Sequence, residues 1–159
     1  MPHKQPFIDL IKSKFDTTKP LKGIEIGCYE GALIKMFLEQ IPTLDMTTID
    51  VAPIYQKIVE SSLPFMQRLR ILHCESDEAV PLIKGQVDFV YIDGDHSYEQ
   101  CKKDIINYLP LVRSGGILAG HNYHKAESSA HPGVHLSVDE IFGDKVKLLF
   151  DFTWYVEIP

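Results

Sequence analysis

The chain has 159 residues, of which 45% are hydrophobic, which is enough for one domain with a buried core and too little for two. Its formal net charge of −6 and the lack of clustered Lys and Arg argue against nucleic acid and anionic membranes as partners. It has no apolar run of about 18 residues and no segment resembling a signal peptide, so we expect a soluble, cytoplasmic protein.

Short apolar runs alternate with segments of helical period, which is typical of a parallel sheet with crossover helices. In chain order, we expect a helix at 6–15, a strand at 22–28, a helix at 31–40, a strand at 46–50, a helix at 54–68, a strand at 70–74, a short helix at 77–84, a strand at 87–93, a helix at 97–111, a strand at 116–121, a short helix at 137–143 and closing strands at 145–152 and 153–158. Antiparallel pairing of the closing strands is left open.

The predicted fold class is therefore α/β, with a Rossmann-like, doubly wound sheet that has helices on both faces. It contains five parallel core strands and two C-terminal strands. We expect residues 1–159 to form a single domain, in which 1–20 contain an N-terminal helix and 122–137 form a loop over the substrate site.

Polar residues and glycine follow the predicted parallel strands. In an open α/β sheet, ligands gather beyond the carboxyl ends of the strands, so these residues should share one edge. They are Gly27, Asp50, Ser76, Asp93 and His121.

The stretch "EIGCYEG" predicts a strand that runs into a glycine turn opening a helix. Gly27 and Gly31 would allow close approach of backbone to a ligand. Two glycines are a weaker signal than GxGxxG, so a nucleotide-like ligand and a plain tight turn are both open. Asp50 ends the next strand, where a carboxylate either binds ribose hydroxyls or caps the turn before "VAP".

Four stretches resemble, in order and spacing, the successive motifs of class I S-adenosylmethionine-dependent methyltransferases. They are "IEIGCYEGALIKMFLE", "TTIDVAP", "DFVYIDGDHSYEQCKKDI" and "LPLVRSGGILAGHNYH". The resemblance is nearest to small bacterial members with "IDGDHSY", and then to the metal-dependent catechol and caffeoyl-coenzyme A O-methyltransferases. It implies S-adenosylmethionine as the cofactor.

The resemblance also implies roles for individual residues in cofactor binding. Asp50 would bind the ribose, and Ser76 and Asp77 would border the adenine. For Ser76, a helix N-cap is a compatible alternative. The full implied set is Glu25, Gly27, Gly31, Asp50, Ser76, Asp77 and Asp93, with the first three at the methionine part of the cofactor.

By the same resemblance, Asp93, His121 and Asn122 match the ligands of a divalent metal, and His96 matches the position of a general base. A histidine in the set disfavours magnesium and would suit manganese, iron, nickel or zinc. The alternatives are that His121 and Asn122 only line the substrate entrance and that His96 has a structural role. Asp95 is expected to cap the helix at 97–111.

The expected function is O-methylation of a small hydroxylated molecule, such as a sugar or a secondary metabolite, with or without metal assistance. A metal-independent N- or carboxyl-methyltransferase and a non-catalytic S-adenosylmethionine-binding module are the alternatives. The histidines His121, His124, His131 and His135, with Asp93, also leave a hydrolase-type metal cluster open. The C-terminal "FTWYVEI" either contributes to a homodimer contact or covers the sheet edge.

Overall fold

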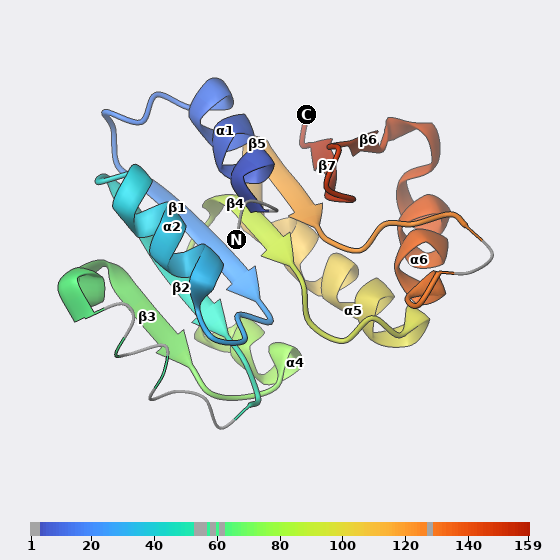
Figure 1. Cartoon of the computed structure of the whole chain (residues 1–159), viewed down its shortest axis with the longest axis horizontal. Coiled ribbons are helices and arrows are strands. Elements are labelled where there is room, and N and C mark those ends of the chain that lie inside the picture. Colours follow the sequence, from blue (N-terminus) through green and yellow to red (C-terminus); the bar gives the residue numbers. More distant parts are fainter. Residues whose placement is uncertain (1–3, 53–56, 58–59, 61–62, 127–128) are drawn as a thin grey trace.

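The computed structural model of the chain describes residues 4–52, 57, 60, 63–126 and 129–159. Its centre is a seven-stranded sheet of order β3-β2-β1-β4-β5-β7-β6 (Figure 1). The strands are β1 (Leu21–Ile26), β2 (Leu44–Ile49), β3 (Leu69–Leu72), β4 (Val87–Ile92), β5 (Val112–Gly120), β6 (Lys147–Leu148) and β7 (Trp154–Glu157).

The first five strands are parallel, whereas β7 runs antiparallel to both β5 and β6. The strand order reverses direction along the chain between β1 and β4, which is the position where open α/β sheets bind ligands. The predicted fold class, with five parallel strands and two closing strands, is confirmed.

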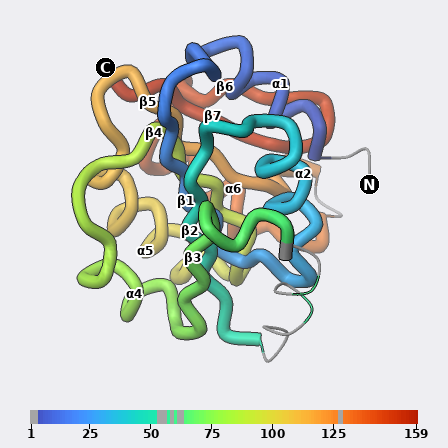
Figure 2. Tube along the Cα trace, turned by 90° about the vertical axis from the view of Figure 1, so that its left-hand side faces the viewer, coloured from blue at the N-terminus to red at the C-terminus, as the bar shows by residue number. Residues whose placement is uncertain are grey.

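Helices cover both faces of the sheet. They are α1 (Gln5–Lys14), α2 (Ala32–Gln40), α4 (Ser76–Ala79), α5 (Tyr98–Tyr108) and α6 (Pro132–Phe142), with 3-10 turns η2 (Leu63–Arg68), η3 (Val80–Leu82), η4 (Leu109–Leu111) and η5 (Gly143–Lys145). Figure 2 shows α1 and α2 on one side of the strands and α4 and α5 on the other. The apolar core is divided accordingly into one cluster under α1 and α2 and another under α5 and α6.

Strand β4 is buried at every position, because it is the middle strand of the sheet and is covered on both faces. Its Phe89 and Tyr91 face the α1 side, while Val90 and Ile92 face the α5 side. The residues that follow β4 are therefore held at the centre of the sheet edge.

Three sequence expectations need correction. Within the expected helix at 54–68, the described residues Lys57 and Glu60 are α-helical, but Leu63–Arg68 form a 3-10 turn, and 53–56, 58–59 and 61–62 lie outside the described residues. The expected loop 122–137 is too long, because α6 already begins at Pro132. Proline suits a first helical turn, and Gly133 lets α6 approach α5: a Cβ there would lie 2.4 Å from the backbone nitrogen of Tyr98. The strand expected at 145–152 is only Lys147–Leu148.

The C-terminal aromatic stretch divides between the core and the surface. Trp154 is fully buried and packs against Phe142, with ring centroids 6.1 Å apart. Trp154 therefore covers the sheet, as one of the two sequence interpretations had it, and only its exposed neighbours, such as Phe152, are free to meet another subunit. In the part of the chain that the structure describes, no helix has the length and apolar character needed to cross a membrane.

Candidate functional site

Residues at the carboxyl edge of the sheet are fixed by a row of backbone hydrogen bonds. The first residue after each of four parallel strands donates its N–H to a carbonyl at the end of a neighbouring strand. The bonds are Asp50 to Leu72 (3.2 Å), Gly27 to Ile49 (2.9 Å), Asp93 to Ile26 (2.8 Å) and His121 to Ile92 (3.0 Å). The four predicted positions thus lie side by side, one strand apart.

A cavity of about 370 Å³ lies at this edge, within the size range of small-molecule sites. Its lining includes the predicted residues Gly27, Asp50, Ser76 and Asp93. The other residues lining it are Ile26, Tyr29, Ile49, Val51, Cys74, Glu75, Gly94, Asp95, Gln100 and Asp104.

Gly27 brings the backbones after β1 and β4 into contact. Its φ of +79° lies in the left-handed region, and an added Cβ would lie 2.2 Å from the carbonyl oxygen of Asp93. Neither condition tolerates a side chain. Gly31 (φ +76°) forms the N-cap of α2 without a side-chain cap, so backbone N–H groups at the start of α2 are left for another partner.

Glu25 is a buried carboxylate without a full set of partners. Its side chain is 2% exposed, and its Oε2 has no hydrogen-bond partner. Burial raises the pKa of Glu25 to about 8, against the opposing charge of Lys4 and with smaller contributions from Asp93 and Asp50. A buried oxygen without a partner is costly, so an arriving cationic or N–H group would be stabilised here.

Asp50 uses both carboxylate oxygens to hold the turns around the cavity. Oδ2 accepts from the backbone N–H of Tyr29 (2.8 Å), and Oδ1 accepts from that of Ala52 (2.8 Å). The capping interpretation of Asp50 is therefore present in the structure. Asp50 also lines the cavity, so the capping role does not remove it from the site.

Ser76 of α4 belongs to a polar network with two side chains of α5. Its hydroxyl donates to Oδ1 of Asp104 (2.5 Å) and accepts from Nε2 of Gln100 (3.1 Å). Burial raises the pKa of Asp104, although the hydrogen bonds from Ser76 and Gln100 act to lower it. Ser76 is not the N-cap that was considered, because Glu75 caps α4 in a reciprocal capping box with Glu78.

Asp77 is bound to side chains of α5. Its carboxylate pairs with the ammonium of Lys103 and accepts from Nδ2 of Asn107 (3.0 Å), both on α5, and Asp77 does not line the cavity. The geometry therefore gives no support to a contact between Asp77 and the cofactor.

Asp93 lies at the centre of a charged cluster. Its Oδ2 pairs with the ammonium of Lys4, and its Oδ1 lies 3.4 Å from Nε2 of His96 and 3.9 Å from Nδ1 of His121. Burial opposes ionisation of Asp93, but the hydrogen bond from His96 and the charge of Lys4 outweigh it, so the pKa of Asp93 is lowered. Asp93 is therefore a carboxylate that is already neutralised by protein groups.

The proposed metal ligands Asp93, His121 and Asn122 lie together but do not fit an ion in this arrangement. Nε2 of His121 donates to the carbonyl of Asp151 (2.9 Å), and its Nδ1 lies 2.6 Å from Oδ1 of Asn122. Two ligands at bond lengths of about 2.1 Å would stand about 3 Å apart or more. His121 and Asn122 contact each other, and Lys4 already engages one oxygen of Asp93.

His96 lies between Asp93 and the loop before α6. Its ring centroid is 4.2 Å from that of His131, whose pKa is lowered by burial and by the nearby His96. The helix cap expected at Asp95 is instead Ser97, which accepts from the N–H of Gln100 (3.3 Å). Asp95 accepts from the N–H of Ser97 (2.7 Å) and so fixes the turn that presents His96.

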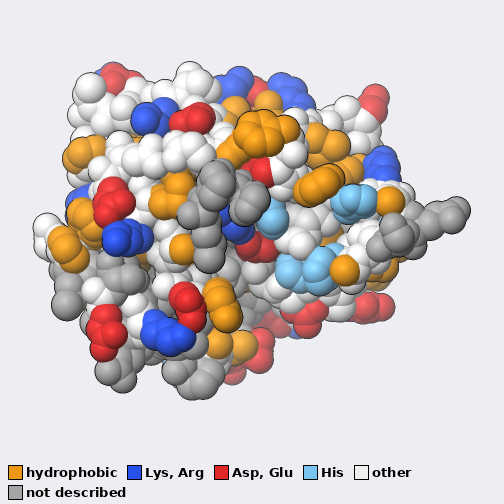
Figure 3. Space-filling view, in the orientation of Figure 1, with side chains coloured by type: hydrophobic (Ala, Val, Ile, Leu, Met, Phe, Trp, Pro, Cys, Tyr) orange, Lys and Arg blue, Asp and Glu red, His pale blue; other side chains and the backbone are white. Residues whose placement is uncertain are grey.

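A second cavity, of about 380 Å³, adjoins His121. It is lined by His121, Asn122, His124, Ser129, Ala130, His131 and Phe152. Figure 3 shows histidine side chains gathered on this face of the molecule. Within the described ranges, no three His, Cys, Asp or Glu side chains are placed to hold a metal ion, and His135 lies against Tyr123 instead. The hydrolase-type cluster is not supported.

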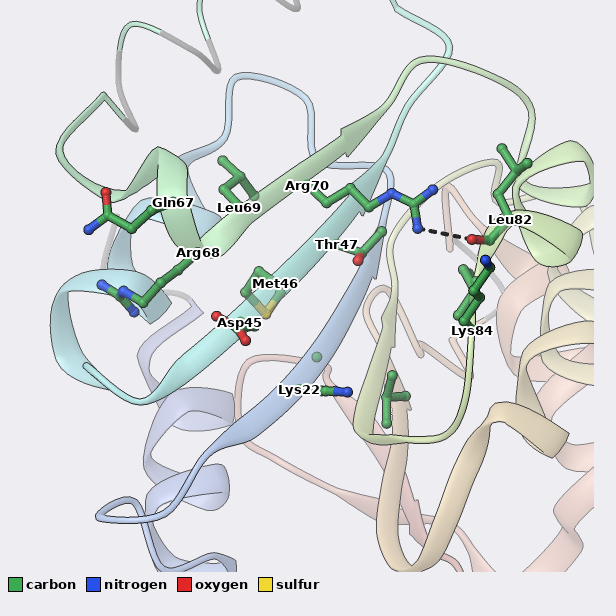
Figure 4. A pocket seen from close by; sticks show the side chains of 13 residues that line it. Lys22, Asp45, Met46, Thr47, Gln67, Arg68, Leu69, Arg70, Leu82 and Lys84 are labelled. Carbon is green, nitrogen blue, oxygen red and sulfur yellow. Dashed lines mark hydrogen bonds between the residues drawn. The ribbon is translucent and has the colours of Figure 1, made fainter.

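A larger cavity, of about 540 Å³, opens at the amino ends of β1 to β3, away from these residues (Figure 4). Lys22, Asp45, Thr47 and Arg70 contribute to its walls, and Arg70 donates to the carbonyl of Leu82 (2.9 Å). Ligands of open α/β sheets bind at the opposite edge, and none of the predicted site residues lines this cavity.

A family model described as "Methyltransferase domain" matches residues 24–123, which span β1 to the end of β5 and the residues that follow it. The chain belongs to this methyltransferase family. An uncharacterized protein of Acanthamoeba polyphaga mimivirus is 25% identical over 135 residues, covering 78% of this methyltransferase chain. The chain spans 60% of the length of that curated relative.

Solved structures with the same fold include both O- and N-methyltransferases. A proposed caffeoyl-CoA O-methyltransferase from Staphylococcus aureus has a TM-score of 0.77 at 17% identity, over 99% of this chain and 83% of that one. The O-methyltransferase TomG from Streptomyces achromogenes, in complex with S-adenosylmethionine, has a TM-score of 0.76 at 11% identity, over 99% of this chain and 80% of that one. The N-methyltransferase NodS from Bradyrhizobium japonicum has a TM-score of 0.69 at 15% identity, over 99% of this chain and 88% of that one. These likenesses establish the methyltransferase fold.

Sequence reasoning missed several groups at this site. Asp104 had a signal, since it is a carboxylate on the helix face of 97–111 that also carries the buried Cys101 and Ile105. Gln100, one turn before it, shares that face. Lys4 had none, because only packing of α1 against the sheet brings it to Asp93.

Proposed function

We propose that this methyltransferase domain binds S-adenosylmethionine at the carboxyl edge of β1, β2 and β4 and methylates a hydroxyl group of a small molecule. The observation that carries the proposal is the cavity beside Gly27, Asp50 and Ser76, which meets the Asp93 and His96 pair at its rim. A cofactor pocket and a candidate proton acceptor therefore adjoin each other.

The residues fit the cofactor. Gly27 keeps the floor of the cavity free of side-chain atoms. Glu25 does not itself line the cavity, but it lies one residue before the lining Ile26 and offers a buried oxygen that lacks a partner. Asp50 and Ser76 supply polar atoms farther along the cavity, where ribose and adenine would lie. When bound, S-adenosylmethionine supplies a methyl group activated by the adjacent positive sulfur.

His96 is the proposed general base. Since Nε2 faces the carboxylate of Asp93 at 3.4 Å, it is the nitrogen that keeps its proton, and Nδ1 is left to accept the proton of the substrate hydroxyl. Asp93 fixes the ring and stabilises the imidazolium that forms. The acceptor would occupy the cavity beside His121, His131 and Phe152. His96 does not line this cavity, but its ring centroid lies 4.2 Å from that of His131, which does.

We predict that His96→Ala lowers turnover by about 100-fold or more, because proton transfer by a positioned side chain contributes that much. Release of S-adenosylhomocysteine is followed with a panel of catechols and hydroxylated sugars. Binding of S-adenosylhomocysteine, measured by calorimetry, should change less than twofold. His135→Gln is the control, since the ring of His135 lies against Tyr123, whereas that of His96 lies beside Asp93. An unchanged turnover in His96→Ala would remove His96 from the mechanism.

Methylation of nitrogen or carboxylate is the second candidate, and the shared fold of NodS is the observation that favours it. Mass spectrometry of the methylated product separates the two, because O- and N-methyl groups fragment differently. If S-adenosylmethionine binds but no acceptor in the panel is methylated, a non-catalytic binding module becomes the better description.

A further inference from the structure

The site contains a cation of its own. Lys4 lies immediately before α1, and its ammonium pairs with Oδ2 of Asp93. The same ammonium lies 5.0 Å from the centroid of the Tyr91 ring, within reach of a cation–π contact. The side chains of Lys4 and Asp93 are only 18% and 17% exposed, so solvent screens this pair less than a surface pair.

The position of Lys4 is built into the fold because α1 is packed tightly on the sheet. Phe7 and Ile8 are fully buried. The ring of Phe7 packs against those of Tyr91 and Phe37, with ring centroids 4.6 Å and 5.8 Å apart. The residue that precedes this helix is therefore held over the end of β4.

Two imidazoles lie around the other oxygen of the same carboxylate. Nε2 of His96 and Nδ1 of His121 are 3.4 Å and 3.9 Å from Oδ1 of Asp93. One carboxylate and two imidazoles are residue types that bind manganese or zinc, although in the described residues they are not placed to hold an ion in this arrangement. In this protein, however, the ammonium of Lys4 already pairs with the carboxylate.

We propose that Lys4 takes the place of a divalent metal ion: its ammonium neutralises and fixes Asp93, so the site works without a metal and would bind one only when Lys4 is removed. Lys4 is thus a positioning residue, which acts on the site through Asp93. This deepens the proposed function, because it assigns metal independence to the site that is proposed to methylate the acceptor.

The test measures binding of Mn²⁺ alone, by electron paramagnetic resonance of the free ion. Lys4→Met removes the charge and keeps the length of the side chain. We expect this variant to bind Mn²⁺ at least tenfold more tightly than the unchanged protein. Adding Asp93→Asn to Lys4→Met should abolish the gain, and Lys4→Arg, which keeps the cation, should show none. The matched control is Lys12→Met, an exposed lysine of the same helix, which should bind Mn²⁺ like the unchanged protein.

The proposal is overturned if the unchanged protein binds Mn²⁺ as tightly as Lys4→Met, or if Lys4→Met gains no affinity while its circular dichroism shows it folded. Calorimetry with S-adenosylhomocysteine runs in parallel. Failure of the unchanged protein to bind S-adenosylhomocysteine would refute the proposed function, whereas the Mn²⁺ comparison decides the role of Lys4 independently of that result.

Discussion

At the scale of single residues, Glu25 has the most unusual environment in the site. The ordinary pKa of its carboxyl is 4.5, and burial raises it to about 8 in the folded protein. The folded chain therefore retains a proton between these values that the unfolded chain has lost. The contribution of Glu25 to stability is greatest below pH 4.5 and falls as the pH rises toward 8.

We predict that Glu25→Gln raises the free energy of unfolding at pH 8, by on the order of a few kcal/mol, and has little effect at pH 5. The reason is that glutamine fills the same space and cannot ionise. Urea unfolding at the two pH values measures the difference. Glu39→Gln, at a half-exposed position of α2, is the control and should show no such pH dependence. Equal effects of Glu25→Gln at both pH values would contradict the raised pKa.

The same carboxyl should couple cofactor binding to proton release. S-adenosylhomocysteine carries an amino group in its methionine part, and an ammonium next to Glu25 favours the ionised carboxylate. We therefore expect proton release on binding at pH 7, and an affinity that rises with pH until about 8 and then levels off. Calorimetry in two buffers of different ionisation enthalpy measures the protons released. Glu25→Gln should release none, and proton uptake by the unchanged protein would refute the coupling.

At the scale of elements, the turn between β1 and α2 decides whether the edge of the sheet can form. We predict that Gly27→Ala abolishes binding of S-adenosylhomocysteine and lowers the free energy of unfolding by about 3 kcal/mol or more. The reason is that the added Cβ clashes with the backbone of Asp93 and that φ at this position is unfavourable for alanine. Calorimetry and urea unfolding measure the two effects.

Gly85→Ala is the matched control for Gly27→Ala. Gly85 has a φ of +77°, close to that of Gly27, but a Cβ there meets no atom within 4 Å. In this control, the free energy of unfolding should fall only by the cost of the strained backbone, about 1 kcal/mol, and the protein should still bind S-adenosylhomocysteine. If both variants behave alike, the close approach of the two backbones is not what matters.

Elements were also where sequence reasoning succeeded and failed most clearly. Periodicity located the parallel strands, because the core strands such as β4 are continuous apolar runs with polar turns behind them. It placed the start of α6 too late, since Pro132 and Gly133 were taken for loop residues although they suit a first helical turn packed on α5. The ion pair of Lys4 with Asp93 joins residues 89 positions apart, and no local pattern encodes such a contact.

At the scale of the whole molecule, two cavities lie at opposite ends of the same strands, and we predict that only one binds the cofactor. Hydrogen exchange with and without S-adenosylhomocysteine should show added protection at 27–31, 50–52 and 93–97. Protection should not change around Lys22 and Arg70, which line the cavity at the amino ends. The reverse pattern would move the cofactor site to the other end of the sheet.

The homodimer stays a prediction, and exposed Leu148, Phe150 and Phe152 lie at the edge where it would form.

The row of backbone hydrogen bonds across the sheet edge has a consequence for how such a protein can be changed. Four residues are held there by their own main-chain N–H groups, which no substitution except proline removes. They are Gly27, Asp50, Asp93 and His121. At Asp93 and His121, the main-chain frame is therefore separate from the side-chain chemistry, whereas the carboxylate of Asp50 also holds two turns. A library that varies Asp93 and His121 should keep a folded scaffold, and new acceptor specificities can be sought there without redesigning the fold.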